Sequence, residues 1–175
     1  MRKMLFGILA LAGLVFNTAC EEIAGEGWIV DWAPVDITIE AYDAAGNSII
    51  SPEMPGMTLT FMNETYEVRG EESMYDPIET KYFMPRMYGL IAKSIKGDQG
   101  TLEKYILYFG QINGASDMDE DILLNWPDGS SDTIHYHCGN HREGRNPKCD
   151  RSWKLNGAKH SGSNFIFNGK SLPSE

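Results

Sequence analysis

The sequence predicts an all-β domain, arranged as an antiparallel β-sandwich of about eight or nine short strands with at most one short helix. Apolar and polar residues alternate in several short segments, which is the period of a strand with one buried face. Turn signals rich in glycine, proline, asparagine and aspartate separate these segments at regular intervals. Short strands with such spacing are typical of sandwiches and barrels.

The N-terminal half begins with the clearest predicted strand, which follows Pro34. Apolar side chains occupy every odd position from Val35 to Ala41, with polar residues between them. A turn at 44–47 leads to a short predicted strand at 48–50. Residues 57–69 predict a hairpin whose corner is at Asn63 and Glu64.

One stretch carries the start signal of a helix. Asp76, Pro77 and Glu79 stand where an N-cap, a first-turn proline and an acid at the third helical position belong. The sequence therefore predicts a short helix over 77–84, ended by Pro85.

The C-terminal half predicts the remaining strands. Residues 86–95 and 103–112 are apolar on both faces, as central strands covered on both sides would be. A turn at 127–130 predicts a hairpin whose apolar residues share one face: Ile122, Leu124, Trp126, Ile134, Tyr136 and Cys138. Residues 151–157 and 163–169 predict the last two strands, separated by a glycine and serine turn.

The first twenty residues have the zones of a bacterial export signal. Arg2 and Lys3 precede an apolar run at 4–16, which is too short to span a bilayer comfortably. Cys20 follows Ala19 and resembles the acylated cysteine of bacterial lipoproteins. We therefore expect residues 1–19 to be a lipoprotein signal peptide, 20–33 an acidic tether and 34–175 a single domain. A secreted protein cleaved elsewhere is the alternative.

The net negative charge of the chain limits the classes of molecule that it is expected to bind. The whole chain has a formal charge of −10, and loss of Arg2 and Lys3 with residues 1–19 would leave −12. Nucleic acids and anionic headgroups are recognised by clustered basic residues, so both are unlikely targets for this chain. We expect attachment to the membrane through a lipid anchor, on an outer-membrane protein that is periplasmic or surface-exposed.

Three stretches carry a resemblance to a known group: "WAPVDITIEAYDAAGNSIISPEMPG" at 32–56, "DMDEDILLNWPDGSSDTIHYHC" at 117–138 and "CDRSWKLNG" at 149–157. The chain resembles small Bacteroidetes lipoproteins of unknown function. The resemblance implies a lipid-anchored, immunoglobulin-like β-sandwich. It implies no activity and assigns no functional residues.

Cys138 and Cys149 are the two cysteines that remain if Cys20 is acylated. Because an exported domain meets an oxidising compartment, the pair predicts a disulfide that closes the polar loop 139–148. The alternative is a zinc site that combines the two thiolates with His135, His137 or His141.

Two further groups are weak candidates for metal binding. His135 and His137 share one face of a predicted strand, and a third ligand would come from His160 or Asp132. Alternating acids in a loop are a second candidate, this time for calcium: Asp117, Asp119 and Asp121. Ile122 stands where an EF-hand needs glycine, so this is not an EF-hand, and a solvated acidic loop is the simpler interpretation.

The sequence shows no catalytic motif. It has no G-x-S-x-G elbow and no phosphate-binding glycine loop, so we expect neither an enzyme nor a cofactor. The predicted function is a lipid-anchored binding or assembly module of the cell envelope with a protein or glycan partner. A carboxylate-dependent hydrolase acting on glycans is the alternative. Core packing is the expected role of most aromatic residues, although four tryptophans could also form a sugar platform: Trp28, Trp32, Trp126 and Trp153.

Overall fold

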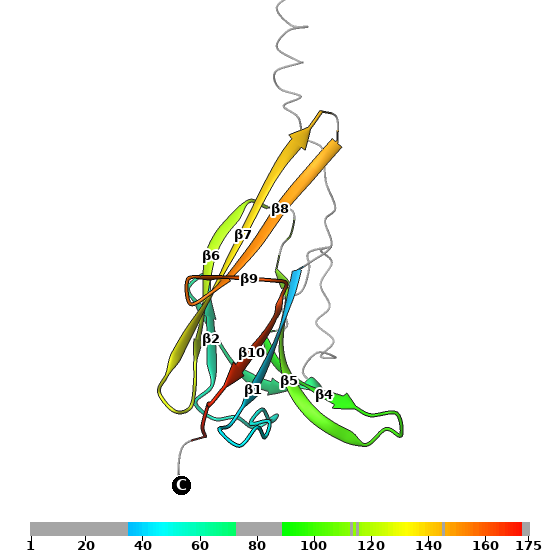
Figure 1. Ribbon diagram of the computed structural model, residues 1–175, viewed down its shortest axis with the longest axis vertical. Helices are drawn as coiled ribbons and strands as arrows, with labels where there is room; N and C mark the ends of the chain where they lie inside the picture. The colour runs from blue at the N-terminus through cyan, green and yellow to red at the C-terminus, as the bar shows by residue number, and fades with distance from the viewer. Residues whose placement is uncertain (1–34, 73–88, 113, 115, 145, 173–175) are drawn as a thin grey trace, which may run out of the picture. The chain divides into compact units, whose positions relative to one another are not determined.

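The computed structural model describes residues 35–72, 89–112, 114, 116–144 and 146–172 (Figure 1). All of them belong to the unit Trp32–Glu175. Within these residues the protein is all-β and has no α-helix. The predicted helix at 77–84, the signal segment 1–19 with its cleavage site at Cys20, and the tether 20–33 lie outside the described residues.

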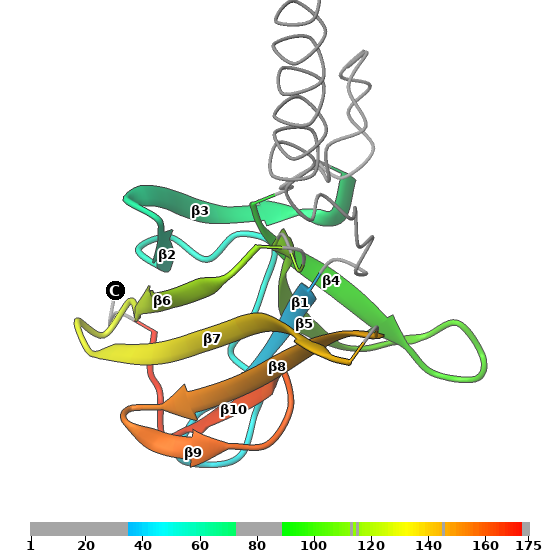
Figure 2. The same cartoon turned by 90° about the horizontal axis from the view of Figure 1, so that it is seen from above.

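The strands form one ten-stranded sheet in the order β10-β1-β5-β4-β3-β2-β6-β7-β8-β9. Figure 2 shows β2, β6, β7, β8 and β9 lying one after another, while β10, β1, β5 and β4 form the other part of the curled sheet. The bounds of the strands are β1 Val35–Tyr42, β2 Thr58–Phe61, β3 Glu64–Gly70, β4 Leu90–Lys96, β5 Leu102–Ile112, β6 Met118–Asn125, β7 Ser131–Glu143, β8 Asn146–Leu155, β9 Ala158–His160 and β10 Asn164–Asn168.

The sheet is mixed, so the prediction of a purely antiparallel sheet was wrong. β10 lies parallel to β1, with Ile39 opposite Phe165, and the end of β3 lies parallel to β4, with Val68 opposite Leu90. Residue alternation fixes which face of a strand is buried but not which strand becomes its neighbour or in which direction. The partner of β1 in particular lies far away in the sequence.

The predicted count of eight or nine strands was also too low. β9 has three residues, too few to display an alternation, and it was missed. In the opposite direction, the strand predicted at 48–50 is only an isolated bridge between Tyr42 and Ser48. Ile49 and Ile50 are nevertheless buried.

The alternating patterns themselves are confirmed. The odd positions of β1 from Val35 to Ala41 are buried. The predicted hairpin at 57–69 is formed by β2 and β3, but its turn is at Met62 and Asn63, one residue before the predicted corner at Asn63 and Glu64. Both turn residues have positive φ angles, 50° and 66°, as a two-residue type I′ hairpin turn requires.

Aromatic side chains join distant parts of the sheet inside the curl. Phe61 of β2 packs edge-on against Phe109 of β5, with ring centroids 5.8 Å apart. The ring centroids of Trp153 in β8 and Phe165 in β10 are 5.7 Å apart. Those of Trp126, directly after β6, and Phe167 are 5.1 Å apart. Trp126 and Trp153 are buried, as the packing prediction requires. Trp28 and Trp32 lie outside the described residues.

The two ends of the sheet, β9 and β10, are joined by side-chain contacts. The ring of His160 in β9 stacks on Phe165 with centroids 4.5 Å apart. A ring nitrogen of His160, Nε2, lies 2.9 Å from the backbone oxygen of Asn164. The two ends of the sheet are thus joined by side-chain contacts and not by paired strands.

β7 and β8 continue past the rest of the sheet as a two-stranded ribbon. β6 pairs with β7 as far as Cys138, whereas β7 and β8 pair with each other out to Glu143 and Asn146 (Figure 1). The ribbon residues beyond Cys138 are paired with one strand only.

Candidate binding site

The outer face of β6 and β7 carries two acids opposite two histidines. In the strand register Asp119 lies opposite His137, and Asp121 lies opposite His135. The alternate positions of both strands, such as Ile122 and Tyr136, are buried in the core. His135 and His137 therefore share the face opposite Tyr136, as predicted.

The four side chains are in direct contact. His135 Nδ1 lies 2.9 Å from Asp121 Oδ1, and its Nε2 lies 3.1 Å from Asp119 Oδ1. The same Asp119 oxygen lies 3.2 Å from His137 Nδ1. A neutral imidazole carries a single N–H, so His135 donates to one carboxylate when neutral and to both when protonated.

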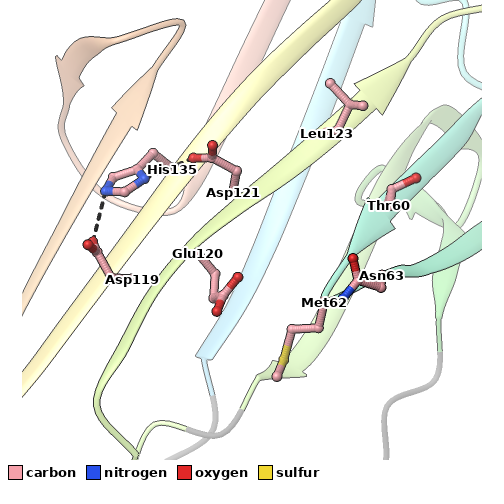
Figure 3. Close-up of a pocket in the computed structure, with 8 residues that line it drawn as sticks. All are labelled: Thr60, Met62, Asn63, Asp119, Glu120, Asp121, Leu123 and His135. Carbon is pink, nitrogen blue, oxygen red and sulfur yellow. Dashed lines mark hydrogen bonds and ion pairs between the residues drawn. The ribbon is translucent and has the colours of Figure 1, made fainter.

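A pocket of about 330 Å³ lies between this acidic face and the β2–β3 turn. Figure 3 shows the acids and His135 on one side and Met62, Asn63 and Thr60 on the other, with Leu123 between them at one end. We call this pocket the acidic groove; its lining residues are Thr60, Met62, Asn63, Asp119, Glu120, Asp121, Leu123 and His135.

Met62 and Leu123 give the acidic groove an apolar component. The Met62 side chain is 57% exposed and that of Leu123 is 38% exposed. Sequence reasoning missed both residues, since Leu123 lies within an apolar run. A signal for Met62 was available, because it directly precedes Asn63 at a hairpin corner, where asparagine and glycine are favoured over bulky residues.

The other candidate ligands are held away from the two histidines. Asp117 accepts a hydrogen bond from the backbone nitrogen of Asn140 at 2.7 Å. Asp132 accepts one from Trp126 Nε1 at 2.7 Å, and His160 stacks on Phe165. Among the residues that the structure describes, no three histidine, cysteine, aspartate or glutamate side chains are arranged to hold a metal ion. Zinc and calcium binding stay predictions.

The two cysteines of β7 and β8 lie next to each other. Their sulfur atoms are 2.9 Å apart, compared with about 2.05 Å in a disulfide bond. Cys138 is opposite Arg151 and Cys149 is opposite Asn140, so the pair is diagonal across the two strands. The disulfide stays a prediction. The two sulfur atoms lie close enough for the bond to form.

The two cysteines and the histidines proposed as their zinc-binding partners lie on opposite faces of the sheet. Cys138 is buried with Tyr136 on the inner face of β7, whereas His135 and His137 lie on its outer face. Burial raises the pKa of the Cys149 thiol, and the hydrogen bond with Cys138 raises it further, while Arg151 acts in the opposite direction.

A second hollow, of about 760 Å³, is lined by residues 52–58 together with Glu67 and Val68. The two large apolar residues of its loop, Met54 and Met57, are buried in the core. The apolar residues that this hollow leaves open are Pro52, Pro55 and Val68, whereas the acidic groove combines exposed Met62 and Leu123 with acids, and we take it as the better candidate.

Searches of family models, of curated proteins and of solved structures find no match to this chain. No helix in the described part of the chain is long and apolar enough to cross a membrane.

Proposed function

We propose that the chain is a lipid-anchored module of the cell envelope that binds a partner protein through the acidic groove and catalyses no reaction. Met62 is the observation that carries the proposal. It combines an exposed apolar side chain with a left-handed backbone, a conformation that costs a residue other than glycine about 1 kcal/mol. Unfavourable conformations of this kind are concentrated at functional surfaces.

A protein suits this groove better than a glycan does. Sugar rings are commonly bound on the flat face of an aromatic side chain, and none of the described residues that line the groove is aromatic. Trp126 and Trp153 are buried in the core instead. Methionine is enriched at protein–protein interfaces, and charged residues are usual at their rim, so exposed Met62 beside the acids suits a protein partner.

The acids of the groove fit binding better than hydrolysis. A carboxylic acid that donates its proton to a glycosidic oxygen is normally set in an apolar, buried position. Asp119 and Asp121 are 71% and 66% exposed and are engaged by histidines. The hydrolase alternative therefore has weaker support.

Further expectations from the sequence belong to the same proposal. We propose that Cys20 carries the lipid anchor and that the protein resides at the outer membrane. We also propose that the curled sheet is a variant of the immunoglobulin-like sandwich, with the arms on either side of β3 as its two layers. The contact between Phe61 and Phe109 across the curl supports this arrangement.

Photocrosslinking in cells that make the protein natively tests the binding surface. p-Benzoylphenylalanine is placed at Leu123 in the groove, and in a control variant at Leu102 of β5, which is 52% exposed. We expect a discrete protein adduct from position 123 and none from position 102. No adduct at position 123, or the same adducts at both positions, would contradict the proposal.

A further inference from the structure

The acidic groove holds negative charge that the protein does not neutralise. Asp119 and Asp121 each contact a histidine through Oδ1, and the second oxygen of each carboxylate has no protein partner among the described residues. The side chain of Glu120 likewise forms no hydrogen bond or ion pair within the described part of the chain, and it lines the same groove. No lysine or arginine is among the lining residues.

Across the groove from the acids of β6, the β2–β3 turn exposes an apolar side chain, Met62. Met62 projects from the β2–β3 turn toward the acidic strand, and Leu123 closes one end (Figure 3). The groove thus presents aliphatic surface, at Met62 of the turn and at Leu123 of β6, next to the carboxylates of β6. A lysine or arginine side chain has the matching construction, because an aliphatic stem carries a cationic head.

We propose that the acidic groove receives a lysine or arginine side chain from a segment of the partner protein. The stem packs on Met62 and Leu123, and the cationic head lies between the carboxylates of Asp119 and Asp121. This inference rests on the proposed function, since it names the chemistry of the partner at the same surface. The net negative charge of the chain favours approach of such a segment.

Two peptides that differ only in the charge of one side chain test whether binding to the groove requires a cation. The probe is the pentapeptide Ala-Leu-Arg-Leu-Ala, added to the full chain in detergent micelles, and binding is followed by NMR shifts of backbone amides. The matched control peptide carries citrulline, which keeps the shape of arginine without its charge. We expect the arginine peptide to shift the amides of Leu123 and His135, and the citrulline peptide to bind about tenfold more weakly.

Variants of the chain test the contribution of the carboxylates and that of Met62 separately. Asp119→Asn with Asp121→Asn should weaken arginine-peptide binding about tenfold, because each exposed charge contact contributes a few-fold change. Met62→Asn suits the left-handed turn, so it should fold normally and still bind about threefold more weakly. Asp98→Asn and Leu102→Asn, which lie outside the groove, should bind like the unchanged chain.

Three results would overturn the inference. The first is equal binding of the arginine and citrulline peptides. The second is binding that the groove variants leave unchanged. The third is self-association of the chain that the double aspartate variant abolishes, because the occupant would then be a second copy. If the arginine peptide does not bind while position 123 still gives a protein adduct, the proposed function stands and the inference of a lysine or arginine in the groove is wrong. Failure of both experiments removes the groove as a binding surface.

Discussion

Met62 lies where the hairpin turn favours a different residue. Asparagine tolerates the left-handed conformation better than methionine does, because its short polar side chain bonds to the local backbone. We therefore expect Met62→Asn to raise the free energy of unfolding by about 0.5–1 kcal/mol in urea titrations. Leu102→Asn, in a strand, is the control and should not stabilise the protein. A loss of stability in Met62→Asn would contradict the turn described here.

Asp132 forms an ion pair with Lys170 that is nearly closed off from solvent. The carboxylate and the ammonium are 2.6 Å apart, with 11% and 13% of the side chains exposed. Burial acts to raise the pKa of Asp132, but hydrogen bonds from Lys170, Asn156 and Trp126 outweigh it, and the pKa is lowered. The pair links the start of β7 to the residues that follow β10.

Asp132→Asn should destabilise the protein by about 2 kcal/mol at pH 7, because it leaves the partly buried Lys170 ammonium without its counter-ion. A lowered folded-state pKa contributes stability that is complete above the ordinary pKa of the carboxyl group and is lost as pH falls through the folded pKa. Urea titrations between pH 7 and pH 3 should therefore show a smaller acid-induced loss in the variant. Asp98→Asn, on an exposed turn, is the control and should change stability by less than about 0.5 kcal/mol.

At the scale of the elements, the β7–β8 ribbon extends beyond its neighbours and is crossed near its base by Cys138 and Cys149. We expect the exported protein to show no free thiol from this pair after unfolding without reductant. Changing both cysteines to serine should lower the free energy of unfolding by about 2–5 kcal/mol, the usual loss for a native bridge. Thiol titration and mass spectrometry check the bond, and urea titration checks its effect. Two titratable thiols in the exported protein would disprove the bridge.

Single-residue alternation was sufficient to predict β1, the β2–β3 hairpin and the β6–β7 hairpin. It also predicted that His135 and His137 share an outer face. Their contacts with Asp119 and Asp121 depend on the register of β6 against β7, which alternation alone does not specify. The parallel pairing of β1 with β10 could not be predicted, because it is decided by packing between residues distant in the chain.

At the scale of the whole molecule, the anchor predicted at Cys20 decides where the domain resides. If Cys20 is acylated as we propose, Cys20→Ser should abolish acylation and move the protein from the membrane pellet to the soluble fraction, because the acyl chains would then supply the attachment. Labelling with a fatty acid and fractionation of cells check both effects. Continued sedimentation of the variant with the membrane, together with no label on the unchanged chain, would disprove the lipoprotein assignment.

The pairing of β1 with β10 has a consequence for how the chain reaches its folded state. Thr38 bonds to Asn164, 126 residues later, and Phe165 fills the space against Trp153. Such high contact order makes folding slow, because a long loop must close before the core gains its contacts. A nascent or translocating chain cannot complete this core until residue 168 has emerged. During that interval the exposed aromatic surface would need a chaperone to prevent aggregation.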